Sequence, residues 1–185
     1  MKYILSSLLI ILISLSHNSR AASIYGGVGY SYNVLSSEID FWNGGDGLDP
    51  FFAIGTKIKN LSLEFSYRSL EIEHIHTTAS GTYDILITDD LMTLGARLDF
   101  SRLTHANFGV VKHSVDISYT TNSTATLNKN SIAGESFSIF IGGGLHGSLF
   151  LPDLRYIVDF NYYHRSSKFG LFSIEAGIFY NILSF

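Results

Sequence analysis

Apolar and polar residues alternate one by one along much of this chain. The clearest run begins at Leu61, where an apolar face and a polar face interleave: Leu61, Leu63, Phe65 and Tyr67 against Ser62, Glu64, Ser66 and Arg68. A period of two is typical of β-strands that have one apolar side. Similar runs fall near residues 23–32, 51–59, 92–100, 136–149, 154–162 and 172–182, and a run of mixed phase falls at 106–119. The sequence therefore predicts eight strands.

The connectors between these strands alternate in length. Long polar connectors are predicted at residues 33–49, 74–87 and 120–135, tight ones at 59–60, 101–104 and 151–153, and one of middling length at 166–170. Short turns at one end and long loops at the other are typical of bacterial outer-membrane β-barrels. We therefore predict an all-β fold: an eight-stranded antiparallel up-and-down transmembrane β-barrel with both chain ends on the periplasmic side. The side chains expected to face lipid include Leu61, Leu63, Phe65, Leu94, Leu98, Val158 and Phe160.

Two strands depart from a simple alternation. After Arg68, the apolar residues Leu70 and Ile72 fall on the face that carries the charge, and in the run at 106–119 the apolar residues are divided between both faces. A β-bulge inserts one residue and would shift the phase in this way. Emergence of the strand above the membrane would also account for the change, so the pattern leaves both explanations open.

The first residues have the features of a secretory leader. Lys2 precedes an apolar stretch at residues 3–15, and the small residues Ser19 and Ala21 stand where a signal peptidase would cut before Ala22. The stretch is shorter than the roughly 20 residues that a membrane-spanning helix needs. We predict a signal peptide at residues 1–21 and one barrel domain at residues 22–185; an uncleaved N-terminal anchor is the alternative.

Composition narrows the chemistry further. The chain contains no cysteine, which excludes disulfides and thiolate metal sites. Without Lys2 and Arg20, ten of the 12 basic residues remain against 16 acidic ones, a net charge of −6. No part of the chain is basic enough to suggest nucleic acid as a partner.

Charged residues recur on the faces opposite the apolar rows. In an eight-stranded barrel these faces point into a narrow interior filled by side chains, where charges must pair. We predict an interior charge cluster drawn from Lys57, Glu64, Arg68, Arg97, Asp99 and Asp159, with the glycines at 142–144 leaving space for long side chains. In a soluble sandwich the same charges would form a solvated surface, but the leader and the near balance of signs favour the barrel. An interior filled in this way disfavours a solute channel.

The chain resembles the small eight-stranded outer-membrane barrels of the OmpA-like and OmpX-like type over residues 22–185. The resemblance rests on the leader, the strands, the alternating connectors and the ending at 180–185, which closes on the aromatic Phe185. It implies the outer membrane of a Gram-negative bacterium, contact with membrane lipid and lipopolysaccharide, and recognition of Phe185 by the barrel-assembly machinery. Architecture of this kind does not imply a function.

A second, local resemblance concerns the last hairpin. His164, Ser166 and Glu175 look like the active-site residues of PagL-type lipid A deacylases. The resemblance implies that His164 activates Ser166 as a nucleophile and that Glu175 orients His164. The last strand has two possible phases. The better apolar face, with Phe172 and Ile174 outward, turns Glu175 inward and away from His164, whereas the opposite phase would bring Glu175 back to it. We therefore predict a non-enzymatic barrel with a role in envelope structure or surface interaction, whose long loops would bind an extracellular ligand. The lipid A deacylase is the alternative.

Three further groups are candidate sites for a ligand or a partner. His74 and His76 form a His-x-His pair without an evident third ligand. Asp40, Asp46 and Asp49 alternate with glycines, but the EF-hand spacing is absent. Trp42 is expected to pack against its own loop or to touch a partner. The sequence therefore predicts no metal and no cofactor.

Overall fold

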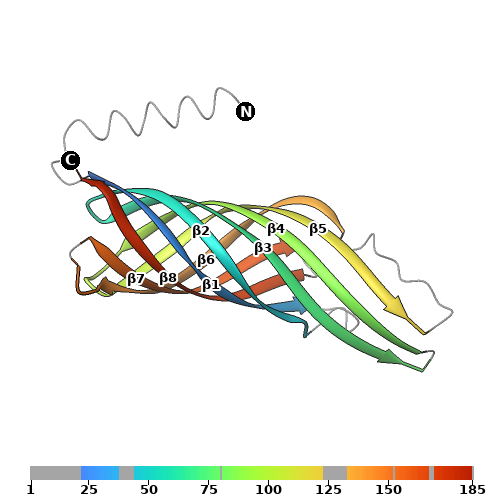
Figure 1. Ribbon diagram of the computed structural model, residues 1–185. Coiled ribbons are helices and arrows are strands. Elements are labelled where there is room, and N and C mark those ends of the chain that lie inside the picture. The colour runs from blue at the N-terminus through green and yellow to red at the C-terminus, as the bar shows by residue number, and fades with distance from the viewer. Residues whose placement is uncertain are drawn as a thin grey trace.

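The eight predicted strands form one closed barrel in the computed structural model (Figure 1), which describes residues 22–37, 44–79, 81–122, 133–151, 153–166 and 169–184. The strands are β1 (Ala22–Ser37), β2 (Asp46–Ile58), β3 (Leu61–Thr78), β4 (Gly81–Asp99), β5 (Thr104–Thr121), β6 (Gly134–Ser148), β7 (Leu154–Ser166) and β8 (Phe169–Ser184). Each pairs antiparallel with the next, and β8 pairs with β1. The predicted up-and-down barrel is confirmed. Within the described ranges, no helix is long and apolar enough to cross a membrane.

The turns after β2, β4 and β6 lie together with both ends of the strand ring. Ser23 at the start of β1 pairs with Ser184 at the end of β8, and Figure 1 shows these ends side by side. The two-residue turn after β2 belongs to the same end and carries Lys59 in the left-handed region, at φ 55°. A positive φ in a two-residue turn matches the twist of the two strands that it joins. We call this end of the barrel the terminal end and the opposite one the distal end.

The outer face near the terminal end is apolar. All of the residues predicted to face lipid lie there, with Phe65, Leu94, Leu98 and Phe160 among the exposed large hydrophobic side chains. Strand alternation places their polar neighbours inside, so that Ser62, Ser66 and Arg97 are buried. The alternation in the sequence thus gives this part of the barrel an apolar outer face and a polar inner face.

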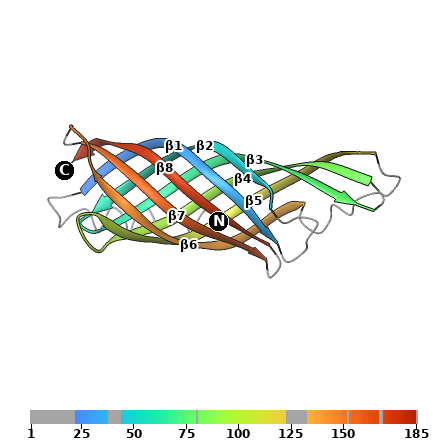
Figure 2. The ribbon, with the colours of Figure 1, turned by 90° about the horizontal axis from the view of Figure 1, so that it is seen from below.

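The prediction of a long polar loop at residues 74–87 is wrong. β3 continues to Thr78 and β4 begins at Gly81, so that regular pairing runs from Leu61 with Leu98 to Thr78 with Gly81. Figures 1 and 2 show β3, β4 and β5 reaching beyond the other strands at the distal end. Of the other predicted long connectors, strands occupy residues 33–37, 46–49, 120–121 and 134–135.

The phase change after Arg68 is not a bulge, because β3 and β4 keep one register throughout. Leu70 and Ile72 stay on the inner face, where they are buried with apolar side chains of β4, β5 and β8. The same cluster takes up the inward residues of β5, including Val111, Val115 and Ile117. The interior therefore changes along the barrel, from charged near the terminal end to apolar near the distal end. We call the apolar cluster the distal core.

Candidate functional site: the charged interior

The terminal half of the interior holds the charges that the sequence places on inward faces. All six predicted residues lie inside the barrel: Lys57, Glu64, Arg68, Arg97, Asp99 and Asp159. They come from β2, β3, β4 and β7, and strand alternation turns each of them away from the outer face. Arg68 forms a group of its own with Glu175. The other five residues form two sets of ion pairs, which the contacts of two histidines join into a second group.

The first group centres on Arg68, which is 2% exposed. Its guanidinium binds the Glu175 carboxylate with both terminal nitrogens, Nη1 to Oε1 at 2.5 Å and Nη2 to Oε2 at 3.0 Å. Nη2 also donates to the Tyr163 hydroxyl at 2.9 Å, and that hydroxyl donates to Glu175 Oε1 at 2.7 Å. The centroids of the Phe51 and Tyr163 rings lie 5.4 and 5.3 Å from the guanidinium carbon of Arg68. Aromatic faces thus cover a bidentate ion pair at the edge of the distal core.

The second group centres on Arg97. Its Nη1 lies 3.3 Å from Glu64 Oε2, and its Nη2 lies 3.3 Å from Asp159 Oδ2. Tyr25 donates its hydroxyl to Glu64 Oε2 at 3.0 Å, while Lys57 forms a separate ion pair with Asp99. Arg97 therefore supplies a positive charge to two inward carboxylates.

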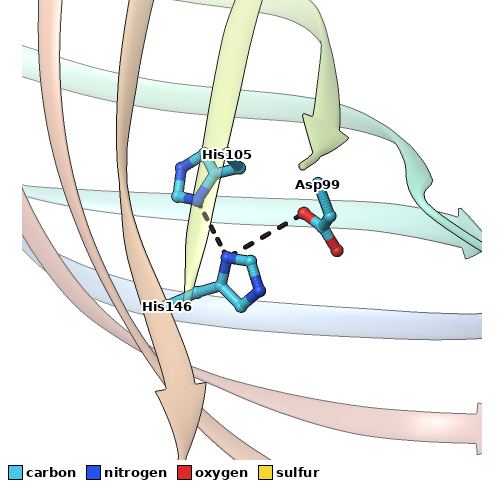
Figure 3. A group of neighbouring side chains, drawn as sticks. All are labelled: Asp99, His105 and His146. Atoms are coloured by element: carbon cyan, nitrogen blue, oxygen red, sulfur yellow. Dashed lines mark hydrogen bonds and ion pairs between the residues drawn. The ribbon is translucent and has the colours of Figure 1, made fainter. Parts of the chain in front are cut away.

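Two histidines extend this second group toward the terminal end. Asp99 on β4 pairs directly with His105 on β5, and His146 on the neighbouring β6 completes the set. Figure 3 shows the two imidazole rings and the Asp99 carboxylate pointing toward one another. The Nδ1 atoms of the histidines are 3.0 Å apart, and His146 Nδ1 is 3.9 Å from Asp99 Oδ1. Among the described residues, this group of three has the ligand types and the spacing that could hold a metal ion.

Asp159 reaches His105 across β6 because Gly144 lies between them. Gly144 pairs with His105 on one side and with Asp159 on the other. A β-carbon on Gly144 would lie 2.3 Å from Asp159 Oδ1. The glycine therefore leaves room for the carboxylate, whose Oδ1 is 2.5 Å from His105 Nε2. The predicted role of residues 142–144 was to accommodate long basic side chains, whereas Gly144 accommodates an aspartate.

Sequence reasoning did not identify several of these residues. His105 and Asn107 follow a tight turn and give no motif, although Asn107 donates to Asp159 Oδ2 at 3.1 Å. A further buried pair joins His113 Nδ1 to Asp89 Oδ2 at 2.7 Å, next to the distal core. The signal available in the sequence was the inward phase of these side chains, which is also the signal that located the arginines.

The structure does not bring together the residues of the deacylase alternative. Glu175 is buried inside the barrel, where its carboxylate binds Arg68 and Tyr163. His164 lies on the outer face and is exposed, and the pairing of β7 with β8 becomes irregular between His164 and Ser166. Because Glu175 and His164 are on opposite faces of the barrel wall, no Ser166–His164–Glu175 triad is formed.

The other candidate ligands separate as well. Asp46 accepts a hydrogen bond from the Tyr32 hydroxyl at 3.1 Å on the outside, whereas Asp49 is buried and accepts from Asn33 at 3.3 Å. Because these two aspartates point to opposite faces, they do not share a cation. His74 and His76 lie on β3 with ring centroids 6.0 Å apart. The predicted leader at 1–21, Asp40, Trp42 and Phe185 lie outside the described residues.

No family model matches this chain, and no curated protein matches it. Solved structures do. The attachment invasion locus protein Ail of Yersinia pestis has a TM-score of 0.54 at 10% identity over 88% of this chain and 98% of its own. Neisserial surface protein A gives 0.53 at 14% identity over 87% and 99% of the two chains.

The outer-membrane protein OprG of Pseudomonas aeruginosa gives a TM-score of 0.51 at 9% identity over 89% of this chain and 98% of its own. These neighbours are small eight-stranded outer-membrane barrels, so the resemblance to such barrels is confirmed for the fold. Identities this low carry only the fold, and these neighbours do not show the local resemblance to PagL-type deacylases.

Proposed function

We propose that this chain is a non-enzymatic integral barrel of the outer membrane of a Gram-negative bacterium, with a role in envelope structure or surface interaction. The observation that carries the proposal is an inversion of polarity at one level of the barrel. On three adjacent strands the outer face turns from apolar to polar between neighbouring outward residues: Tyr67 and Ser69, Met92 and Asp90, Val110 and Lys112. At the same level the interior turns apolar, and Leu70, Leu91 and Val111 are fully buried.

This inversion indicates a change of the surrounding medium. A soluble sandwich keeps its apolar side inward along the whole strand, because water surrounds all of it. Here one continuous strand has apolar residues outside in one half and inside in the other. A hydrocarbon layer around the terminal half and water around the distal half account for both halves.

Tyrosines mark the level of the change. Tyr67 and Tyr32 expose their rings on the outer face, and their hydroxyls donate to Asp90 at 3.2 Å and to Asp46 at 3.1 Å. A ring in hydrocarbon with its hydroxyl in the polar layer is the arrangement found in the aromatic girdles of membrane barrels. The girdle supports contact of this outer face with membrane lipid and lipopolysaccharide.

The interior supports a structural role. The side chains of Arg68, Arg97, Phe51 and Phe179 meet across it, with the Arg97 guanidinium carbon 5.8 Å from the Phe179 ring. Such packing leaves no wide path for a solute. The deacylase is not favoured, because the carboxylate that would orient His164 is bound to Arg68.

The distal part of β3, β4 and β5 is the element we assign to surface interaction. The inward side chains of this sheet belong to the distal core, so packing as well as strand pairing holds it in place. Its outer side carries exposed acidic side chains, among them Glu71, Glu73, Asp84 and Asp116. In the proposed orientation this sheet stands outside the cell, where its polar face meets water and an extracellular ligand.

Fractionation of cells that express the full chain tests the proposal. The protein is expected in the outer-membrane fraction, and a change in gel mobility on heating in detergent reports the folded barrel. Removal of Phe185 is expected to lower the assembled amount, because the proposed assembly signal ends there. Recovery of the folded chain in a soluble fraction would overturn the membrane assignment.

A substitution of Leu94 by arginine measures the lipid contact directly. Leu94 is outward and 45% exposed, and lies five residues from Asp99 at the end of β4. This spacing puts it about 13 Å into an apolar band of about 25 Å, near the membrane midplane. We expect Leu94→Arg to lower the free energy of unfolding in lipid vesicles by about 2–4 kcal/mol.

The matched control is Ser118→Arg, an exposed outward position on the distal part of β5. It should leave the free energy of unfolding within about 0.5 kcal/mol of the parent, since a charge there stays in water. Equal effects of the two substitutions would mean that both positions meet the same medium, contrary to the proposal.

A further inference from the structure

Asp99, His105 and His146 are held by paired strands, and no flexible segment has to close around them. Asp99 and His105 are direct cross-strand partners on the inner face. The backbone N–H of His146 donates to the Leu103 carbonyl at 2.9 Å, which fixes β6 beside the turn that joins the other two residues. Side chains placed by strands in this way are preorganised for a ligand.

We propose that these three residues bind one divalent transition-metal ion of the class to which Zn²⁺ belongs. Their ligand atoms all lie within 4.8 Å of one another. Two ligands of a tetrahedral zinc ion lie about 3–4 Å apart, because each bond is close to 2 Å long. The observed separations of 3.0 Å between the Nδ1 atoms and 3.9 Å from His146 Nδ1 to Asp99 Oδ1 need only small side-chain rotations.

His105 is set up as a metal ligand by its contact with Asp159. A carboxylate accepts and cannot donate, so His105 Nε2 carries the proton of the 2.5 Å contact to Asp159 Oδ1. In the neutral ring this leaves the lone pair on Nδ1, which faces His146. A histidine that donates from one nitrogen to a carboxylate and offers the other to the metal is a common arrangement in metal sites.

A metal ion can take the place of the proton that now lies between the Nδ1 atoms of His105 and His146. Two Nδ1 atoms at 3.0 Å require one donor and one acceptor, so His146 carries a proton on Nδ1 when His105 accepts. On metal binding this proton moves to His146 Nε2, and both Nδ1 lone pairs then point to the ion. The ring stays neutral, and no other group has to take up charge.

Room for the fourth ligand lies beside Asp99 and His146. A cavity of about 20 Å³ is bordered by Lys57, Asp99, His146 and Arg155. That volume holds about one water molecule. The side chains of His146 and Asp99 are each 12% exposed, so the ion reaches the site from the terminal end of the barrel.

The charges around the site favour zinc over hard cations. Glu64, Asp99 and Asp159 are balanced by the neighbouring Lys57, Arg97 and Arg155, and Lys57 already binds the second oxygen of Asp99. Mg²⁺ and Ca²⁺ depend on several carboxylate or carbonyl oxygens, which this group does not supply. Two imidazoles and one carboxylate oxygen are a ligand set for Zn²⁺ and its neighbours.

Titration of the full chain, purified from membranes in detergent, tests the site. With ZnCl₂ we expect saturable binding of one ion per barrel in calorimetry, and with MgCl₂ we expect no binding. Co²⁺ should give the visible absorption of a tetrahedral ion, which zinc then removes. Acidification should weaken binding, because protonated imidazole is not a ligand.

Substitutions locate the ion. His146→Ala is expected to lower zinc affinity at least tenfold, and His105→Ala at least as much. Should either alanine variant fail to fold by circular dichroism, His146→Gln keeps a polar side chain and serves instead. His164→Ala, on the outer face, and the pair His74→Ala with His76→Ala are expected to bind as the parent does. No saturable zinc binding, or binding lost in a control and kept in His146→Ala, would overturn the proposal.

Discussion

Replacement of Glu175 by glutamine is expected to lower the free energy of unfolding by about 3–5 kcal/mol. The carboxylate is the bidentate partner of Arg68, and both side chains are buried, at 8% and 2% exposed. Glutamine keeps the size of the side chain but removes its charge, so the guanidinium stays buried without a counter-ion. The Tyr163 hydroxyl also loses its charged acceptor. Urea unfolding in lipid vesicles, followed by circular dichroism, measures the change.

Two comparisons separate this effect from a general intolerance to substitution. Glu135→Gln removes the same charge from an exposed ion pair with Lys112, in which the Glu135 side chain is 66% exposed, and should cost about 0–1 kcal/mol. Changing both partners, Arg68→Met with Glu175→Leu, should recover most of the loss, because an apolar pair needs no charge compensation. If Glu175→Gln costs no more than Glu135→Gln, the buried pair does not stabilise the barrel.

The strands were predictable from the sequence wherever one face of a strand carries apolar residues toward lipid and the other face carries charged residues toward the interior. In the terminal half, outward apolar residues such as Phe65 alternate with inward charged residues such as Glu64, and the phase of these residues gives the inward face. In the distal half this contrast is lost. Polar residues there occupy both faces of β3, with His74 on the inward face and Thr77 on the outward face, and this pattern is typical of a loop. The segment is nevertheless a strand, and the inward residues Ile85 and Ile87 of the partner strand are buried in one cluster with Ile72.

The inward charged residues of β2, β3, β4 and β7 were predictable, but the particular partner of each was not. Phase shows that a side chain points inward, whereas its contact depends on which strands face each other across the barrel. Arg68 and Glu175 are 107 residues apart, and nothing local joins them. The contact of Asp159 with His105 depends on a third residue, because Gly144 has to leave the path open. The curvature and stagger of the closed sheet decide such contacts, and neither can be read from periodicity.

Asp159 is the residue on which the second charge group depends. Its carboxylate accepts from three inward side chains: from Arg97 Nη2 at 3.3 Å, from His105 Nε2 at 2.5 Å and from Asn107 Nδ2 at 3.1 Å. The side chain is 5% exposed, so water cannot replace it. An amide in its place offers one acceptor oxygen and no charge to three donors.

Asp159→Asn is therefore expected to lower the free energy of unfolding by about 3–5 kcal/mol, which urea unfolding in vesicles measures. Asp84→Asn, an exposed outward position on β4, is the control and should change it by no more than about 0.5 kcal/mol. The proposed metal site adds a second readout, because His105 loses the carboxylate that fixes its proton on Nε2. Zinc affinity should fall about 10–100-fold in Asp159→Asn and stay unchanged in Asp84→Asn. A loss of stability with unchanged zinc affinity would show that Asp159 supports Arg97 but does not orient His105.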